Sequence, residues 1–329
     1  MSKRAIVTGV TGQDGSILSE YLLDLGYDVY GFARRTSTGN LSNLKGVLDN
    51  RRFHLIYGDL KDAVFLSDLT RDIHPDEFYH LGAMSQVGHS FVIPAETIAV
   101  DAIPIFTILD TIVKSSKNTR FYFAATSELF GGLQVIESGL HEESTMNPRS
   151  PYAIAKLAGY HACRLYRNRK DGAFASSGIL FNHSSTRRSR DFATRKISRG
   201  VARVRLGLDK KITMGNLSAC RDEGSAHEYV RVMHLILQQD RPDDFVISTG
   251  VSVSIQRMLE FVCELAQLDW KEIVEFDESL MRPSEVPYLC GDSSKARQIF
   301  GWKATKTYRE VLQEMYEHDL KVEATRNKF

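Results

Sequence analysis

Near its amino terminus the chain carries RAIVTGVTGQDGS at residues 4–16. The apolar run at its start predicts a β-strand, and Gly9, Gly12 and Gly15 predict a tight turn that opens into a helix. Because glycine has no Cβ, the backbone N–H groups of such a turn can approach a pyrophosphate at the positive end of the helix. No Gly-Lys-Ser/Thr sequence follows, so the turn favours a dinucleotide cofactor over a nucleoside triphosphate.

Short β-rich runs alternate with longer helical patterns through the first half of the chain. The strand runs lie at 5–7, 28–32, 53–57, 77–81 and 120–124, and two more lie at 177–181 and 244–248. Apolar residues recur at helical spacing in 17–25, before Gly26, and in 254–265 and 308–320. This order predicts an α/β fold built on a doubly wound parallel sheet, the Rossmann arrangement.

The alternating rhythm loosens after 177–181, where Arg and Lys residues gather between Arg187 and Lys211. We therefore expect a cofactor-binding domain at 1–178 and a smaller C-terminal α/β lobe at 179–329 for the substrate, and we allow for a return of residues 209–250 to the first domain. Apolar residues interrupt the basic cluster at helical spacing, which predicts a helix with one solvated face.

The composition of the chain limits which classes of partner and which location we expect for it. Lys and Arg total 42 against 41 Asp and Glu, so the net charge of +1 gives no broad reason to bind nucleic acid or an anionic membrane. The four cysteines are widely spaced without a Cys-x-x-Cys pair, which argues against a disulfide framework and against a metal site. The start of the chain has no apolar signal stretch, and no window approaches about 20 apolar residues, so we expect a cytoplasmic protein.

The end of the second predicted strand indicates which dinucleotide is bound. An acidic residue there would bind the ribose hydroxyls of NAD, but the chain has Arg34 and Arg35. Guanidinium groups suit a 2′-phosphate, so NADP is favoured, and the alternative is a solvated basic loop. Asp59, after the third strand, is placed to accept a hydrogen bond from the adenine amino group.

Two further motifs suggest chemistry at the carboxyl edge of the sheet. Tyr152 and Lys156 lie one helical turn apart, and an ammonium beside a phenol lowers its pKa toward neutrality, which would let Tyr152 act as a base. Thr126 and Glu128 follow the fifth strand directly, at the edge where open α/β sheets bind ligands. A helix-capping carboxylate is the alternative interpretation of Glu128.

With these motifs in this order, the chain resembles the extended short-chain dehydrogenase/reductases, and among them the GDP-mannose 4,6-dehydratases. Further matching pieces are Phe181-Asn182-His183, residues 194–199, 215–217, Arg221-Asp222, 282–286 and Gly291-Asp292. The resemblance implies conversion of GDP-mannose to GDP-4-keto-6-deoxymannose, with internal hydride transfer through NADP. Tyr152, with Thr126 and Lys156, would take the 4-hydroxyl proton, and Glu128 would take the C5 proton and help to expel water.

The resemblance also implies binding residues, and an assembly as a homodimer or homotetramer. For NADP it implies, besides the glycines, Tyr152, Lys156 and the pair of arginines, the residues Thr11, Gln13, Asp14, Asp59, Leu60, Leu81, Ala83 and Ser85. For the GDP-sugar it implies Ser85, Ser127, Asn182, Lys196, Gly215, Asn216, Arg221, Arg282 and Glu285. Arg187 and Arg188, by contrast, are expected to be surface residues.

The chain departs from the usual family pattern near the expected cleft. Met84 and Gln86 replace a usual Gln and His, residues 184–186 read Ser-Ser-Thr for Glu-Ser-Pro, and residues 223–225 read Glu-Gly-Ser for Trp-Gly-His. A GDP-heptose or another modified GDP-sugar is therefore an alternative substrate. A nucleotide-sugar 4-reductase or 4-epimerase would not need Glu128, and a cofactor-binding redox sensor would not need Tyr152 and Lys156.

Overall fold

The computed structural model describes residues 2–37, 39–132 and 139–326. Its largest sheet has seven parallel strands in the order β10-β6-β5-β4-β1-β2-β3. The strands are β1 Arg4–Thr8, β2 Asp28–Ala33, β3 Phe53–Tyr57, β4 Glu77–His80, β5 Arg120–Thr126, β6 Phe174–Leu180 and β10 Asp244–Ile247. All seven predicted strand runs lie in this sheet, and the doubly wound α/β fold is confirmed.

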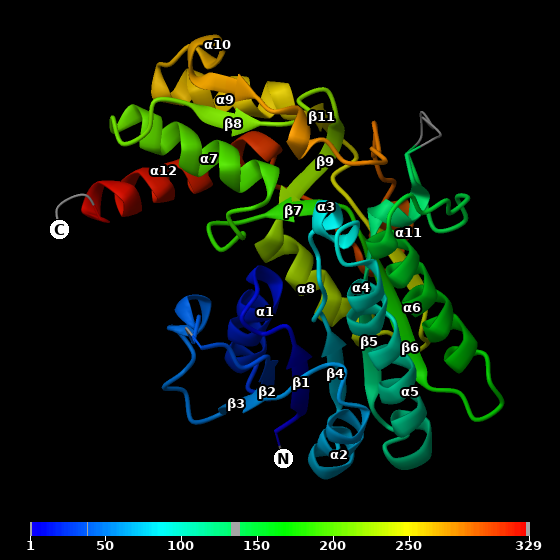
Figure 1. Ribbon diagram of the computed structural model, residues 1–329. Coiled ribbons are helices and arrows are strands. Elements are labelled where there is room, and N and C mark those ends of the chain that lie inside the picture. The colour runs from blue at the N-terminus through cyan, green and yellow to red at the C-terminus, as the bar shows by residue number, and fades with distance from the viewer. Residues whose placement is uncertain (1, 38, 133–138, 327–329) are drawn as a thin grey trace.

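Helices cover both faces of the large sheet (Figure 1). Along β1, Ala5 and Val7 belong to one hydrophobic core and Ile6 to the other, because successive strand residues face opposite sides. The first core is closed by α1 Gln13–Asp24 and α8 Ala226–Leu237, which pack on each other. The second core is closed by α2 Ala63–Ile73, α5 Ile103–Ser115 and α6 Pro151–Arg167. Strands buried on both faces explain the continuous apolar runs in the sequence.

The remaining elements build a smaller lobe at the carboxyl end of the large sheet and connect it to the rest. Three strands, β7 Asn182–Ser184, β9 Cys220–Ser225 and β11 Ser252–Ser254, form one small sheet, and β8 Ile212–Met214 pairs with β12 Val274–Phe276. The helices of this lobe are α7 Ala193–Arg205, α9 Ile255–Ala266, α10 Trp270–Ile273 and α12 Tyr308–Arg326. Three shorter helices elsewhere are α3 Val87–Ser90, α4 Pro94–Asp101 and α11 Ser294–Phe300.

The chain passes between the two lobes more than once. The predicted boundary at residue 178 falls inside β6, whose last residue in the sheet is Leu180. Of residues 209–250, β8 and β9 lie in the small lobe, whereas α8 and β10 pack with the large sheet. We therefore propose a boundary after Leu180, with a return to the first domain from Ala226 to Ile247.

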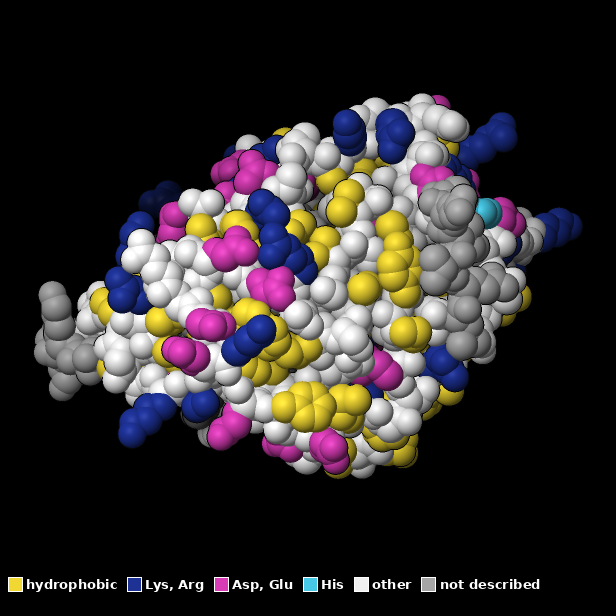
Figure 2. All heavy atoms as spheres, turned by 90° about the horizontal axis from the view of Figure 1, so that it is seen from above, with side chains coloured by type: hydrophobic (Ala, Val, Ile, Leu, Met, Phe, Trp, Pro, Cys, Tyr) yellow, Lys and Arg dark blue, Asp and Glu magenta, His cyan; other side chains and the backbone are white. Residues whose placement is uncertain are grey.

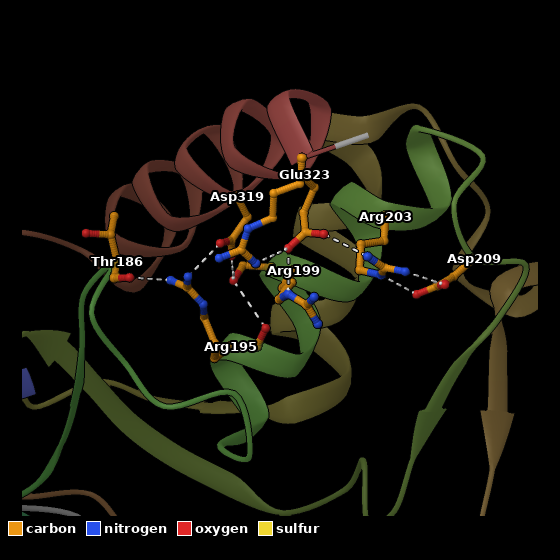
Figure 3. A network of polar contacts seen from close by, with 9 residues as sticks. Thr186, Arg195, Arg199, Arg203, Asp209, Asp319 and Glu323 are labelled. Carbon is orange, nitrogen blue, oxygen red and sulfur yellow. Dashed lines mark hydrogen bonds and ion pairs between the residues drawn. The ribbon is translucent and has the colours of Figure 1, made fainter. Parts of the chain in front are cut away.

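The basic helix α7 packs on α12 through ion pairs (Figure 3). Arg195 contacts Asp319 at 2.7 Å, and Arg199 and Arg203 contact the carboxylate of Glu323 at 2.8 and 2.7 Å. Both carboxylates are almost fully buried. The prediction of a solvated basic face is therefore wrong for these arginines. Asp319 and Glu323 lie more than 100 residues away in the sequence, so the local pattern could not reveal them, although Arg203 also pairs with the nearby Asp209.

The outer surface carries both signs of charge. Seen from above the view of Figure 1, Lys and Arg side chains are interspersed with Asp and Glu, and small hydrophobic patches lie between them (Figure 2). This mixture agrees with the near-zero net charge of the chain. Among the residues described, there is no helix with the length and apolar character needed to cross a membrane.

Candidate active site

A cavity of about 750 Å³ lies between the two lobes. Its walls include the residues that follow β1, β4, β5 and β6, so it opens at the carboxyl edge of the large sheet, where open α/β folds bind ligands. The small lobe contributes residues from α7, β8 and β9. The following predicted site residues line it: Gly9, Thr11, Gly12, Gln13, Asp14, Gly15, Leu81, Ala83, Ser85, Thr126, Ser127, Glu128, Tyr152, Lys156, Asn182, Lys196, Gly215, Asn216, Arg221, Arg282 and Glu285.

The glycine turn is packed so tightly that side chains are excluded. Gly9 has a φ of 69°, and a Cβ there would lie 2.8 Å from the Cα of Gly82. A Cβ on Gly15 would lie 2.4 Å from the carbonyl oxygen of Gly9. All three glycines line the cavity together with the first residues of α1, so backbone at the N-terminus of this helix borders the cavity, as a pyrophosphate site requires. The turn therefore fits a dinucleotide.

Gln13 and Asp14 line the cavity, but their side chains also join the two lobes. The Asp14 carboxylate contacts Nε2 of His183 at 2.9 Å. The Gln13 amide donates to the His183 carbonyl oxygen and accepts a hydrogen bond from the Ser185 hydroxyl. Burial works to raise the pKa of Asp14, but the His183 ring outweighs it and lowers the pKa to about 2. These two side chains thus hold β7 against the glycine turn.

Four predicted cofactor residues lie outside the cavity wall. Arg34 and Arg35 are exposed and follow the last residue of β2 directly. Leu60 packs beside Gly82, where a Cβ would lie 2.9 Å from its Cδ1, and the Asp59 carboxylate accepts a hydrogen bond from the backbone of Lys61. Arg34 and Arg35 follow β2, which pairs with β1, and Asp59 and Leu60 follow β3, which pairs with β2, so all four lie at the same edge of the sheet as the glycine turn.

The four predicted catalytic residues converge. Thr126 ends β5, Glu128 lies in the 3-10 turn Ser127–Phe130, and Tyr152 and Lys156 lie in the first turns of α6. Helix α6 begins there because Ser150 caps it, accepting a hydrogen bond from the backbone of Ala153. All four side chains are buried and line the same cavity, as the sequence predicted.

The surroundings of Tyr152 raise its pKa and do not lower it. Burial raises its pKa above the ordinary value, and Asp101 raises it further, although a hydrogen bond from Thr126 works in the opposite direction. The ammonium of Lys156 lies 5.9 Å from the centre of the Tyr152 ring and donates to the carbonyl oxygen of Ala124 at 2.8 Å. Since burial also lowers the pKa of Lys156, the predicted lowering of the phenol pKa is wrong for this structure.

Glu128 faces a group of charged side chains at the cavity wall. Its carboxylate lies 3.4 Å from Nη1 of Arg282, which also lies 3.6 Å from the carboxylate of Glu285. Arg221 contacts Glu285 as well and donates to the carbonyl oxygen of Val286. The cap of the 3-10 turn is the hydroxyl of Thr126, so Glu128 is not the helix-capping carboxylate that the sequence allowed as an alternative.

The cavity wall also contains residues to which the sequence assigned no site role. Arg188, expected at the surface, lines the cavity and stacks on Phe192, with its guanidinium carbon 3.7 Å from the ring centre. His183 and Glu223 line it too. Glu223 had a signal in the sequence, because residues 223–225 depart from the usual family pattern. Arg188 had none, because this residue belongs to a basic run that predicts a solvated surface. Arg187 instead pairs with Glu20 at 2.7 Å.

Comparison with known proteins agrees with this geometry. The family model described as GDP-mannose 4,6 dehydratase matches residues 6–315. A GDP-mannose 4,6-dehydratase of Vibrio cholerae is 42% identical over 98% of this chain and 95% of its own length. GDP-mannose 4,6 dehydratase 2 of Caenorhabditis elegans is 43% identical over 97% of this chain and 89% of its own length.

Solved structures show the same fold at lower sequence identity. A dTDP-glucose 4,6-dehydratase from Bacillus anthracis, in complex with NAD, matches with a TM-score of 0.85 at 19% identity and covers 98% of both chains. A UDP-glucose 4-epimerase from Thermotoga maritima matches with a TM-score of 0.85 at 22% identity, over 97% of this chain and 99% of its own. The family model and the relatives together show that the chain belongs to the GDP-mannose 4,6-dehydratase family.

Proposed function

We propose that the protein converts GDP-mannose to GDP-4-keto-6-deoxymannose with the loss of one water, as a carbon–oxygen lyase. The observation that carries this proposal is the convergence of a phenol, an ammonium, a hydroxyl and a carboxyl group, those of Tyr152, Lys156, Thr126 and Glu128, in one buried cavity. The activity is the one for which the relatives are named.

The cavity suits a nicotinamide dinucleotide, and we propose NADP. The glycine turn supports the pyrophosphate site, and solved structures of the same fold are complexes with NAD. Arg34 and Arg35 follow β2 at the edge where a 2′-phosphate would lie, which favours NADP over NAD. Held at the glycine turn, the cofactor would supply the hydride acceptor for oxidation at C4 of the hexose and the hydride donor for reduction at C6. Alanine at both arginines should weaken binding of NADP and leave NAD binding unchanged.

Each of the four convergent side chains has a step that suits its chemistry. Tyr152, once deprotonated, takes the proton of the 4-hydroxyl group, while the Thr126 hydroxyl bonds the same oxygen. We assign to Lys156, one turn along α6, the positive charge that favours the phenolate against the burial that raises the pKa of Tyr152. The ketone formed at C4 acidifies the C5–H bond. Glu128 takes that proton and supplies one to the departing 6-hydroxyl group, which leaves as water.

Cationic side chains suit the nucleotide half of the substrate. Arg221 and Arg282 lie together at the cavity wall, and guanidinium groups bind diphosphate oxygens with two hydrogen bonds each. We assign Asn182, Lys196 and these arginines to the sugar and diphosphate. Gly215 and Asn216 would lie near the base, and Glu285 near the ribose.

Incubation of the protein with GDP-mannose and NADP tests the proposal. Mass spectrometry should show a sugar nucleotide lighter by one water, without net consumption of NADPH. Glu128→Gln should allow oxidation at C4 and stall the elimination, because an amide cannot take the C5 proton. A 4-epimerase would yield a product of unchanged mass, and a redox sensor would yield none. Unchanged dehydration by Glu128→Gln would remove this residue from the mechanism.

We also propose that the protein is a homodimer or homotetramer. Helices α5 and α6 pack side by side and expose Ile103, Phe106, Ile154 and Leu165. Isolated apolar side chains are common at protein surfaces, but a group on two neighbouring helices suits an interface. Light scattering after gel filtration measures the mass, and aspartate at Phe106 and Ile154 should shift it to that of a monomer.

A further inference from the structure

Glu223 places a carboxyl group in the cavity wall with one oxygen atom unpaired among the described residues. Its side chain is only 4% exposed, and Oε1 has no hydrogen-bond partner among the described residues. The preceding residue, Asp222, is equally buried, yet it accepts hydrogen bonds from Thr249, Gly250 and Gly291. Buried carboxylates are normally bonded in this way, so the unpaired oxygen of Glu223 requires an explanation.

The strand register places Glu223 among the substrate residues. Alternate residues of a strand share a face, so Glu223 lies on the same side of β9 as Arg221, about 7 Å along the strand. In the parallel pairing of β7 with β9, Glu223 is the partner of Asn182. All three residues line the cavity. Glu223 therefore lies beside Asn182 and on the same face of β9 as Arg221, the residue that we assign to the diphosphate.

The protein offers Glu223 little compensation of its own. Burial raises its pKa, and the charge of Arg188, the neighbouring Ser184 hydroxyl and the charge of His183 only partly oppose this effect. Arg188 stacks on Phe192 and forms no ion pair with Glu223 within the described residues. The hydroxyl of Ser184 also bonds that of Thr194 at 2.9 Å, and Oε1 of Glu223 keeps no partner among the described residues. A ligand that brings a hydrogen-bond donor would complete the site.

We propose that Glu223 accepts a hydrogen bond from the 2- or 3-hydroxyl group of the bound hexose and so determines which sugar is accepted. This inference rests on the proposed function. During the reaction the 4-hydroxyl becomes a ketone and the 6-hydroxyl leaves as water, so the 2- and 3-hydroxyls are the donors that persist on the ring. The ribose hydroxyls of the cofactor offer the same chemistry and are distinguished by the test.

The experiment compares wild-type protein and Glu223→Gln, both loaded with NADP, on GDP-mannose and its 2-deoxy and 3-deoxy analogues. Hydrogen bonds to charged groups correspond to about 10- to 100-fold in kcat/KM. Wild type should lose that factor on one deoxy analogue. Glutamine keeps an acceptor oxygen but not the charge, so Glu223→Gln should lose part of that factor, about 10-fold, on GDP-mannose. On the deoxy analogue that wild type handles poorly, the variant should lose little more, because the hydroxyl group that the charge would bond is then absent.

Glu142→Gln is the matched control, because this partly buried carboxylate accepts a hydrogen bond from Val246 outside the cavity wall. It should leave the preference between the three sugars unchanged. Glu223→Gln should also raise the melting temperature, since it removes a buried charge without a partner. A fall in melting temperature together with an equal loss on all three sugars would mean a structural role and overturn the inference.

Two further measurements separate the possible failures. Weakened NADP binding by Glu223→Gln, with an unchanged preference among the sugars, would assign the residue to the cofactor and overturn the inference. If wild type dehydrates none of the sugars, the proposed function fails. Calorimetric titration of the three GDP-sugars into wild type and Glu223→Gln then still decides whether Glu223 recognises the hydroxyl group.

Discussion

Asp14→Asn should lower the free energy of unfolding by about 2 kcal/mol at pH 6, because it removes the charge that pairs with His183 across the two lobes. The asparagine keeps an oxygen that can accept a hydrogen bond from Nε2 of His183, so the change tests the charge alone. The carboxylate and the ring nitrogen are 2.9 Å apart, and the two side chains are 24% and 9% exposed.

The magnitude follows from the pKa of Asp14. Burial alone would raise this pKa, but His183 and the neighbouring donors lower it from 3.8 to about 2. Each pKa unit corresponds to about 1.4 kcal/mol, so the charged form is stabilised by somewhat more than 2 kcal/mol before solvent screening. Because a quarter of the Asp14 side chain is exposed, about 2 kcal/mol is the expected net effect.

The stabilisation by the Asp14–His183 pair should fall both at acidic and at alkaline pH. The pKa of Asp14 is lowered on folding, so its contribution is present above pH 3.8 and is lost as the pH falls toward 2. Burial works against the charged form of His183, but Asp14 outweighs it and raises the pKa above 6.5. The contribution of His183 to stability is complete below pH 6.5 and is lost as the pH rises through the raised pKa of the folded protein. The cost of Asp14→Asn should therefore be greatest between about pH 4 and 6.5.

Urea denaturation of wild type and Asp14→Asn, followed by circular dichroism from pH 5 to 9, measures the effect. Asp171→Asn serves as the control, since its carboxylate forms an exposed pair with Arg169. The control should change neither the stability nor its pH profile. A destabilisation by Asp14→Asn that stayed constant from pH 5 to 9, or one below about 0.5 kcal/mol at pH 6, would refute the reasoning.

Three other substitutions test separate parts of the structure. Glu323→Ala should cost about 3 kcal/mol in chemical denaturation, because it leaves Arg199 and Arg203 without their buried partner; a cost below 1 kcal/mol would contradict this. Gly15→Ala should weaken NADP binding at least about 10-fold in a fluorescence titration, as its Cβ would meet backbone; wild-type affinity would argue against the tight turn. Tyr152→Phe should lower kcat by about 100-fold or more and keep NADP affinity, whereas retained turnover would exclude Tyr152 as the base.

The large sheet could be predicted from the sequence because its strands are buried on both faces. Such strands appear as short apolar runs between turns, and all seven runs proved to be strands of this sheet. The strands β7 and β9 gave no such signal, because they consist largely of polar residues such as Asn182, Ser184 and Glu223. These strands are polar because they line the cavity. The same polar residues leave no hydrophobic alternation from which a strand could be predicted.

The candidate site was predictable where the chemistry depends on local spacing. Tyr152 and Lys156 are one turn apart on a helix, and Thr126 and Glu128 follow a strand end, so the rules for parallel sheets place them together. The pairing of Asp14 with His183 spans 169 residues and could not be inferred from either local sequence. The direction of the pKa shift of Tyr152 was missed for a related reason, since the burial that raises this pKa depends on residues from many segments.

The family departures at positions 184 and 223 are best understood as one change. Residue 184 lies on β7 and residue 223 on the neighbouring β9, and side chains two residues apart on paired strands share a face and can come within reach of each other. The usual glutamate at 184 is replaced by Ser184, while Glu223 replaces the usual tryptophan. The carboxyl group that lines the cavity therefore starts from β9, whereas Ser184 on β7 is buried and does not line it. We infer that an acceptor on β9, without the bulk of an indole, would alter the sugar preference and leave the reaction intact, because the four convergent side chains of Thr126, Glu128, Tyr152 and Lys156 are all present.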